Sequence, residues 1–268
     1  MAIAPAVNQF SQESFFCRLA TASNSILLLD YDQTIGLFSI SPSYRSSCPS
    51  ISEVLQAIAA QGRTRVILIS ELRVAEVLAL LQMSPAPEIW GSRGLERRSP
   101  NGDCEVLDVL AEAEQALAAV DLSLEGQGLG RMTEVQPGAI TVRWSGLGRR
   151  VAEEVRDRAC EAWLNACDHR WLAAREFEGG IEFRLRLWDK RDAVQQLLCE
   201  LGSEVPVAYL GDEKSNEDAF RVMKHRGLCV LVRPKFIPTS ADLWLQPGEV
   251  ARFVTEWLQT SGSNPRQA

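Results

Sequence analysis

The sequence predicts an α/β protein, in which a Rossmann-like parallel sheet forms the core and a small α+β unit is inserted into it. Three observations support this prediction. Short apolar runs alternate with helical stretches in both outer parts of the chain, which is typical of parallel strands joined by right-handed crossovers. Two of these runs end abruptly in acidic residues. Between the two outer parts, residues 97–187 show a different pattern, with pairs of strand-like runs joined by glycine-containing turns.

The core is expected to comprise residues 1–96 and 188–268. Its expected elements, in chain order, are strand 25–30, helix 51–61, strand 65–70, helix 73–82, strand 87–91, helix 190–202, strand 206–210, helix 216–225 and strand 228–232. Residues 1–22 and 259–268 are expected to be loosely held ends, the second because it is rich in Ser, Gly, Asn and Pro.

The inserted unit is expected to comprise residues 97–187. Turns at Gln136-Pro137-Gly138 and Glu178-Gly179-Gly180 each separate two strand-like runs. The expected elements, in chain order, are helix 104–120, two strands within 126–146, helix 148–166, strand 171–177 and strand 180–186.

The composition is that of an ordinary globular protein. The chain has 268 residues, of which 46% are hydrophobic and 24% charged, enough to bury a substantial core. A formal net charge of −7 argues against nucleic acid as a main partner, because nucleic-acid-binding proteins present a basic face. Seven cysteines without a C-x-x-C pair, and no signal-peptide pattern, predict reduced thiols in the cytoplasm. No apolar run reaches the length of a membrane span. We expect the protein to be a monomer or a weak oligomer.

The most informative segment is the apolar run that ends in Asp30. Ile26–Leu29 are four consecutive aliphatic residues, suited to a buried strand, and they precede Asp30, Asp32 and Thr34. Ligands of open α/β sheets gather beyond the carboxyl ends of strands. Two acids there can share a divalent cation, while one attacks an electrophile and the other transfers a proton. Alternatively, Asp-x-Asp pairs are common in turns, and a metal-dependent glycosyltransferase could carry such a pair.

A second apolar run ends in acids far along the chain. Val207–Leu210 are followed by Gly211, Asp212 and Glu213, and the glycine allows the backbone to turn sharply. Residues 215–218 also fit the start of a helix, with a polar cap and acids in the first turn. A helix start does not account for two acids directly at the strand end, so we expect a second part of the site here.

Two further side chains complete a candidate phosphate site. Ser70 ends the apolar run 66–69, and its hydroxyl can donate to a phosphoryl oxygen. Lys190 precedes an amphipathic helix and can neutralise charge beside a phosphoryl group. Singly, such a serine is often a cap and such a lysine is often solvated. The order of the four pieces along the chain is the specific signal.

In that order the pieces resemble the four motifs of the haloacid dehalogenase superfamily of phosphatases: Asp-x-Asp-x-Thr, Ser/Thr, Lys and Gly-Asp-Asp. The closer resemblance is to the trehalose-6-phosphate phosphatase family, and it extends over residues 24–235. The matching segments are Asp30-Tyr31-Asp32-Gln33-Thr34-Ile35, Ser70-Glu71-Leu72, Gly91-Ser92-Arg93-Gly94-Leu95-Glu96, Glu182-Phe183-Arg184, Asp189-Lys190-Arg191 and 211–220. The ending Glu217-Asp218-Ala219-Phe220 is fairly specific.

The resemblance implies an enzyme that hydrolyses a phosphate ester through an aspartyl phosphate. Asp30 would be the nucleophile, and Asp32 would protonate the leaving oxygen and later activate water. Ser70, Lys190 and Thr34 would bind the phosphoryl group. The inserted unit would be a cap that closes over the substrate.

The resemblance also implies magnesium as the cofactor. The cation would be held by Asp30, the backbone carbonyl of Asp32 and Asp212, and it would keep several waters. Glu213 and Asn216 would orient these ligands from outside the coordination sphere of the cation.

The chain departs from the family pattern in both parts. In the core, Gln33, Leu72, Arg93, Glu213 and Asn216 stand where other residues are usual. In the cap pattern that holds the disaccharide, Glu134 is kept, but four polar positions become Gln136, Ala139, Arg143 and Ser145. Losing polar partners in a site built for them strongly reduces discrimination. The residues expected to contact the sugar are Arg93, Glu96, Glu134, Arg143, Glu182 and Arg184.

The resulting hypothesis is a magnesium-dependent phosphatase of a small-molecule sugar phosphate, with trehalose 6-phosphate as the first candidate. One alternative is a phosphatase of another glycosyl or modified-sugar phosphate, which the rewritten cap pattern favours. The other is a non-catalytic sugar-phosphate-binding homologue. Gln33 and Asn216 favour it, while the intact Asp30, Asp32, Ser70 and other motif residues oppose it.

Overall fold

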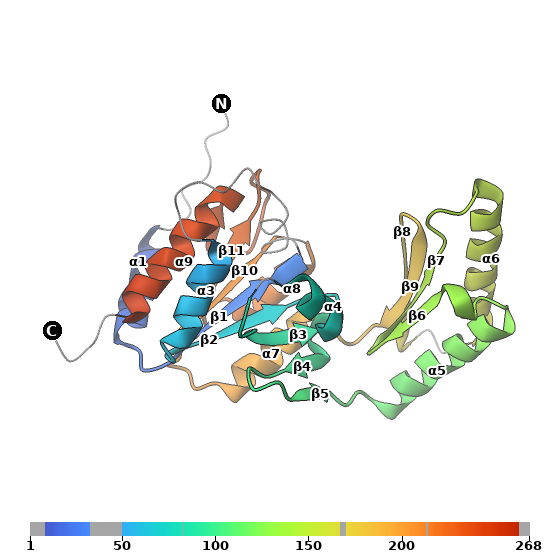
Figure 1. The fold of residues 1–268 in the computed structure, drawn as a ribbon, viewed down its shortest axis with the longest axis horizontal. Coiled ribbons are helices and arrows are strands. Elements are labelled where there is room, and N and C mark those ends of the chain that lie inside the picture. The colour runs from blue at the N-terminus through green and yellow to red at the C-terminus, as the bar shows by residue number, and fades with distance from the viewer. Residues whose placement is uncertain (1–8, 33–49, 82, 167–169, 213, 263–268) are drawn as a thin grey trace. The chain divides into compact units, whose positions relative to one another are not determined.

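The computed structural model describes residues 9–32, 50–81, 83–166, 170–212 and 214–262, and it divides into two compact units (Figure 1). The first unit comprises Met1–Glu105 and Lys190–Ala268, and the second comprises Val106–Asp189. Each unit has its own sheet. Within the described residues, no helix combines the length and the apolar character needed to cross a membrane.

The first unit is built on an eight-stranded sheet with the order β12-β11-β10-β1-β2-β3-β4-β5. The strands are β1 Ser25–Asp30, β2 Thr64–Ile69, β3 Glu88–Gly91, β4 Glu96–Arg98, β5 Cys104–Val106, β10 Val207–Gly211, β11 Leu228–Val232 and β12 Leu243–Leu245. From β12 to β3 all pairings are parallel, and β4 pairs antiparallel with β3. The predicted parallel α/β core is therefore confirmed.

Helices cover both faces of this sheet, which is why its central strands are apolar throughout rather than alternating. The helices are α1 Gln9–Thr21, α3 Ile51–Ala60, α4 Val74–Leu80, α7 Lys190–Glu200, α8 Lys214–Met223 and α9 Val250–Gly262. On one face, Leu27 and Leu29 share a hydrophobic cluster with residues of α1, α3 and α9, which lie together in Figure 1. On the other face, Tyr209 packs against Phe220 of α8.

The expectation of loosely held chain ends is wrong for residues 9–21 and 259–262. The ring centroids of Phe15 in α1 and Trp257 in α9 lie 5.6 Å apart, and those of Phe16 and Phe253 also lie 5.6 Å apart. These aromatic side chains are buried, so α1 and α9 form part of the hydrophobic core. Residues 1–8 and 263–268 lie outside the described residues.

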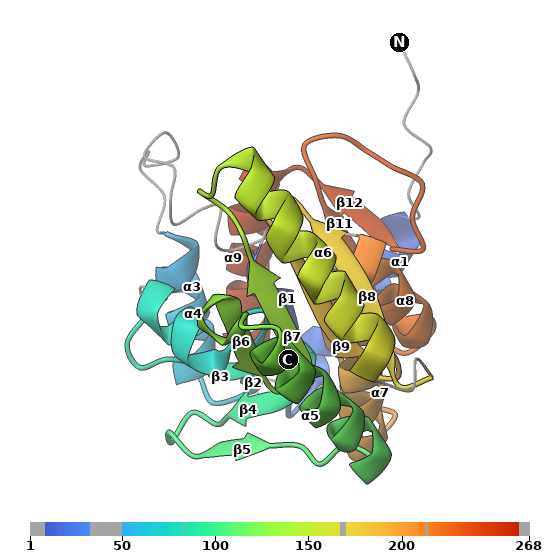
Figure 2. The same ribbon diagram turned by 90° about the vertical axis from the view of Figure 1, so that its right-hand side faces the viewer.

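The second unit contains a four-stranded antiparallel sheet with the order β6-β7-β9-β8. Its elements are α5 Ala111–Gly126, β6 Thr133–Gln136, β7 Ala139–Arg143, α6 Arg149–Ala166, β8 Leu172–Phe177 and β9 Gly180–Leu185. Both helices lie along one face of the sheet (Figures 1 and 2). Trp163 of α6 stacks on Phe183 of β9 with ring centroids 5.1 Å apart, which identifies the face that the helices cover.

The expected boundaries of the insertion differ from those of the second unit. The expected start at residue 97 falls inside β4, which pairs with β3 in the sheet of the first unit. Arg97 holds this strand in place by stacking over the Trp90 ring at 3.9 Å. The expected helix 104–120 is instead strand β5 followed by α5. Short 3₁₀ helices lie at Ser92–Gly94, Gly130–Met132 and Pro247–Glu249.

Candidate active site

Three neighbouring strands bring the candidate catalytic residues to one edge of the core sheet. In the register of β1 and β10, Leu29 pairs with Leu210, so Asp30 and Gly211 end their strands side by side and Asp212 follows at once. On the other side of β1, Asp30 pairs with Ile69 of β2, the residue before Ser70. This edge is the carboxyl end of parallel strands, where α/β folds bind their ligands.

Asp30 lies at the centre of the group and is almost completely buried. Its Oδ2 accepts hydrogen bonds from Lys190 Nζ at 2.6 Å and from Asn216 Nδ2 at 2.9 Å. Its Oδ1 accepts a weaker bond from the backbone N–H of Asp32 at 3.3 Å. Two donors on one oxygen leave the carboxylate little freedom to rotate, so its orientation is well defined.

Lys190 is the first residue of α7 and is 2% exposed. Burial alone would lower the pKa of this ammonium, but the nearby carboxylates of Asp30, Asp32 and Glu71 outweigh it, so the pKa is raised. The side chain therefore carries a positive charge in the site. A buried cation beside a carboxylate can also offset charge on a phosphoryl group.

Asp32 has a different environment from Asp30. Its Oδ1 accepts a short hydrogen bond from Ser70 Oγ, and its Oδ2 accepts one from the backbone N–H of Glu71 at 2.8 Å. Burial and the nearby Asp30 raise the pKa of this carboxyl, although Lys190, Ser70 and Glu71 lower it. A raised pKa keeps a proton available at higher pH, as a general acid requires.

The strand that leads into the fourth motif contributes a side chain that sequence reasoning missed. Tyr209 of β10 is fully buried, and its hydroxyl donates a short hydrogen bond to Asn216 Oδ1. Burial raises the pKa of this phenol well above its usual value, and the carboxylates of Asp30, Asp212 and Asp32 raise it further. All three acids thus lie within electrostatic reach of one hydroxyl. A tyrosine in an otherwise apolar strand, two residues before the turn, was the available signal.

The residues present suit a magnesium site with few protein ligands better than a site in which protein side chains supply every ligand. Among the residues that the structure describes, no group of three or more His, Cys, Asp and Glu side chains is arranged to hold a metal. Asp30 ends β1, Asp212 directly follows the adjacent strand β10, and both residues are buried. Magnesium is usually bound through one or two carboxylates, with waters and substrate phosphate as the other ligands. Thr34 and Glu213 lie outside the described residues.

The expected sugar-contacting residues fall into both units. Arg93 and Glu96 belong to the first unit and are buried there. Arg93 lies 3.7 Å from Glu71, and Glu96 accepts from the backbone N–H of Val74 at 2.7 Å. Glu96 therefore holds the start of α4, a structural contact that the sequence pattern did not reveal.

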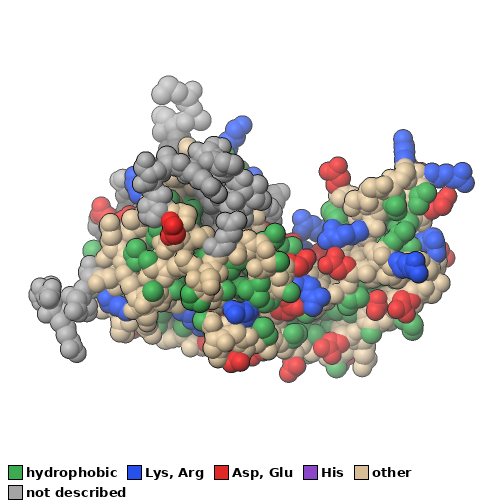
Figure 3. Space-filling view, viewed as in Figure 1, with side chains coloured by type: hydrophobic (Ala, Val, Ile, Leu, Met, Phe, Trp, Pro, Cys, Tyr) green, Lys and Arg blue, Asp and Glu red, His purple; other side chains and the backbone are tan. Residues whose placement is uncertain are grey.

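The other four candidates, Glu134, Arg143, Glu182 and Arg184, share one face of the second unit's sheet. Phe183 points to the helices, so its neighbours in β9 point to the opposite face. Across the sheet, Glu182 pairs with Thr141 of β7, and Arg143 lies 3.3 Å from Glu134. These side chains therefore occupy the face that α5 and α6 leave uncovered. Figure 3 shows side chains of both charge signs on the visible surface of this unit.

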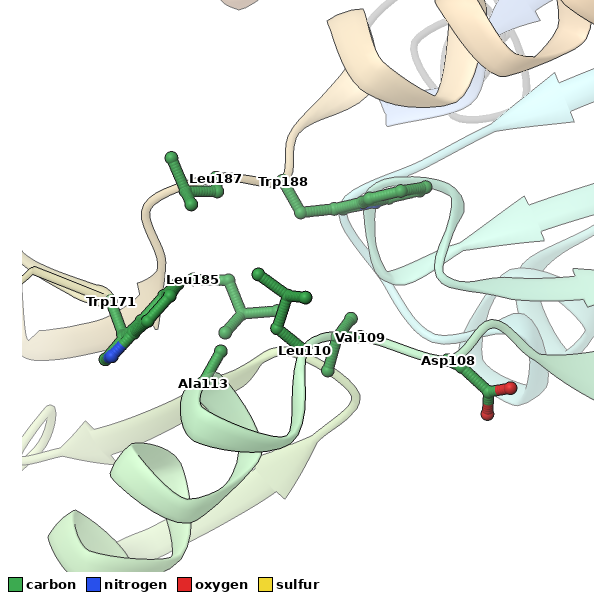
Figure 4. A pocket seen from close by; sticks show the side chains of 8 residues that line it. All are labelled: Asp108, Val109, Leu110, Ala113, Trp171, Leu185, Leu187 and Trp188. Atoms are coloured by element: carbon green, nitrogen blue, oxygen red, sulfur yellow. The ribbon is translucent and has the colours of Figure 1, made fainter.

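The second unit also contains an apolar cavity of about 350 Å³ (Figure 4). It is lined by Asp108, Val109, Leu110, Ala113, Trp171, Leu185, Leu187 and Trp188. None of the candidate catalytic or sugar-contacting residues lines it. The cavity lacks the charged groups that would hold a phosphate, so it is not the candidate active site.

Comparisons with known proteins agree with this architecture. No protein-family model matches the chain. It is 26% identical to trehalose-phosphate phosphatase B of Arabidopsis thaliana, over 94% of this chain and 71% of that protein.

Solved structures show the same fold. A trehalose-6-phosphate phosphatase of Aspergillus fumigatus matches with a TM-score of 0.62 and 21% identity, over 96% of this chain and 100% of that chain. A haloacid dehalogenase-like hydrolase from Bacteroides thetaiotaomicron matches with a TM-score of 0.59 and 15% identity, over 87% and 98%. With the strand-end carboxylates, these similarities support a phosphoric monoester hydrolase that shares the haloacid dehalogenase-like fold and resembles the trehalose-6-phosphate phosphatase family.

Proposed function

We propose that the protein is a magnesium-dependent phosphatase that hydrolyses a sugar phosphate, with trehalose 6-phosphate as its substrate, through an aspartyl-phosphate intermediate. The observation that carries the proposal is the difference in environment between two neighbouring carboxyls. The Asp30 side chain is 1% exposed and lies 2.6 Å from Lys190 Nζ, whereas the Asp32 side chain is 22% exposed and lies 3.7 Å from the same atom. Neighbouring acids with different environments are suited to different roles, here nucleophile and general acid.

The reaction would take place in two steps at these carboxyls. First, an Asp30 oxygen forms a bond to phosphorus while the bond from phosphorus to the sugar oxygen breaks, and Asp32 gives its proton to that oxygen. Then Asp32, now ionised, takes a proton from water as the water oxygen attacks the phosphorus of the aspartyl phosphate. Asp30 is regenerated and inorganic phosphate leaves.

The other residues would bind and balance charge. The Ser70 hydroxyl, which donates to Asp32, would turn to donate to a phosphoryl oxygen when the substrate binds. Lys190 would offset the negative charge of the phosphoryl group, and Thr34 would add a donor. Magnesium, when bound by Asp30, Asp212 and the Asp32 carbonyl, would supply further positive charge at the transferring group.

The sugar is proposed from the relatives and is open to one specific challenge. The Arabidopsis and Aspergillus proteins are described as trehalose-phosphate phosphatases. On the helix-free sheet face of the second unit, Gln136, Ala139 and Arg143 stand where the family uses other polar residues. This observation favours a second candidate, a phosphatase of another glycosyl phosphate.

A phosphate-release panel tests the proposal. Purified protein is assayed with trehalose 6-phosphate, other sugar phosphates and a generic aryl phosphate, each with magnesium and with EDTA. We expect release that depends on magnesium and is largest in kcat/KM for trehalose 6-phosphate. A higher kcat/KM for another sugar phosphate would mean that this other ester is the substrate, while the proposed reaction would stand. Failure to release phosphate from every ester, with magnesium present, would contradict the proposed function.

A further inference from the structure

We propose that Tyr209 is a positioning residue for the nucleophile. Its hydroxyl holds the side-chain amide of Asn216, and that amide in turn holds Oδ2 of Asp30. The inference rests on the proposed function, because it concerns the carboxylate that would attack phosphorus. It assigns a role to Asn216 of the fourth motif and to Tyr209 in the strand that precedes the motif, and neither role requires either residue to bind metal.

The orientation of the amide follows from the chemistry of its two neighbours. Asn216 is fully buried, and its carbonyl and NH₂ ends are interchangeable in shape. An ionised Asp30 only accepts hydrogen bonds, so the NH₂ end must face it. The oxygen end then needs a donor, and the Tyr209 hydroxyl is that donor. Without it, a buried amide oxygen loses its partner, and the opposite orientation would set two oxygens against each other.

The surrounding packing holds this arrangement in place. We call the hydrogen bonds from Tyr209 to Asn216 and from Asn216 to Asp30 the relay. The ring of Tyr209 meets the ring of Phe220 edge-on, with centroids 5.5 Å apart, so Phe220 supports the first residue of the relay. Both residues are completely buried. The phenol therefore has little freedom to turn away from Asn216.

Gly211 is needed for a steric reason. A Cβ added there would lie 2.7 Å from Cγ and 2.8 Å from Nδ2 of Asn216. The glycine therefore leaves the space that the amide occupies on its way to Asp30. Substituting alanine would push the amide away without removing any polar group.

The relay gives a physical meaning to Asn216, where the resemblance implies an aspartate. An amide donates to Asp30, and an ionised aspartate would instead repel it at the same 2.9 Å contact. Asn216 is thus suited to hold the nucleophile. This reading removes one of the two residues that favoured a non-catalytic homologue.

The first test compares two glycine substitutions in the core unit. Gly211→Ala is expected to lower kcat/KM for an aryl phosphate by about ten- to a hundredfold, the size of effect that follows from a small misplacement of a reacting group. Gly202→Ala is the matched control, because a Cβ there meets nothing within 4 Å. We expect its kcat/KM to be unchanged. Equal activity of the two variants would overturn the proposal.

The second test separates positioning from stability. Tyr209→Phe and Asn216→Ala are each expected to lower kcat/KM, and the double variant to be no worse than Asn216→Ala, because both changes break one relay. Thr64→Val removes another buried hydroxyl, one that accepts from Trp257 Nε1 at 3.1 Å far from the site. It is expected to lower stability but not kcat/KM. If the double variant instead lost as much kcat/KM as the two single variants lose together, Tyr209 and Asn216 would act independently and the relay would be contradicted.

A spectroscopic measurement keeps the inference independent of activity. The side-chain NH₂ signals of Asn216, assigned by their loss in Asn216→Asp, are expected to exchange slowly with solvent in the wild type and faster in Tyr209→Phe. Unchanged exchange would overturn the relay. If the wild type released no phosphate, the proposed function would fail, and these signals would still decide whether Tyr209 holds the amide.

Discussion

The candidate active-site edge of the core and the helix-free sheet face of the second unit use charged residues in opposite ways. At the core, the side chains of Lys190 and Asp30 are 3% and 1% exposed and lie 2.6 Å apart. On the sheet face, the side chains of Arg143 and Glu134 are 56% and 42% exposed and lie 3.3 Å apart. A buried charge must have its partner, while an exposed pair contributes little to stability. The comparison predicts that the core chemistry resists change and that the sheet face tolerates it.

The largest expected effect comes from removing the proposed nucleophile. Asp30→Asn keeps the size of the side chain and can still bond to neighbouring groups, but it cannot form the aspartyl phosphate. We expect turnover of every phosphate ester to fall by far more than about a hundredfold, since removing a nucleophile can cost on the order of a millionfold in kcat. Phosphate release and the circular dichroism spectrum are measured together. A folded variant that keeps more than about a hundredth of the wild-type rate would show that another group attacks.

The second prediction concerns the buried ion pair itself. In EDTA, Lys190→Met is expected to lower the free energy of unfolding by about 3–5 kcal/mol, because it leaves the Asp30 carboxylate buried without its cation. Asp30→Asn combined with Lys190→Met should lose less, since no unpaired charge remains at that position. Urea unfolding measures both. The exposed pair of Arg150 and Glu154 provides the control, and Arg150→Met should change stability by no more than about 0.5 kcal/mol. Equal losses for the core and control variants would break the comparison.

The third prediction uses the raised pKa of Asp32. Stability that depends on the protonated carboxyl is fully present below the ordinary aspartate pKa of about 4 and is lost as pH rises through the raised folded-state value. Asp32→Asn stays neutral throughout. In EDTA, the unfolding free energy of the wild type should therefore fall relative to that of the variant across this interval, and then level off. A difference that stays flat, or that grows in favour of the wild type as pH rises, would contradict the raised pKa.

The smallest expected effect lies on the sheet face. Arg143→Gln removes an exposed charge that pairs with Glu134, so stability should change by no more than about 0.5 kcal/mol. We expect KM for the best sugar phosphate to rise a few-fold, while kcat/KM for a small aryl phosphate stays the same. A large loss on the aryl phosphate would mean that this residue takes part in the chemistry and would remove the contrast between the two regions.

The strand ends could be predicted because their signals are local. An apolar run followed at once by acids requires a strand and a turn, and parallel sheets gather such turns at one edge. The strands that carry Asp30, Ser70 and Asp212 are neighbours in the sheet, and the three residues lie at the carboxyl ends of these strands. The chain ends were harder to predict. Residues 9–21 have a weak helical pattern, and their burial depends on Trp257, which lies more than two hundred residues away.

The sequence by itself determined the class of fold and the residue types that stand at the strand ends and in the rewritten cap pattern, since each depends on a short stretch of the chain. Only the tertiary structure decided which atoms meet. It placed Glu96 on the start of α4, joined β4 to the core sheet, and gave Asn216 the hydroxyl of Tyr209 on one side and the carboxylate of Asp30 on the other. These contacts join distant parts of the chain or depend on which way a side chain points, and residue order alone does not specify either.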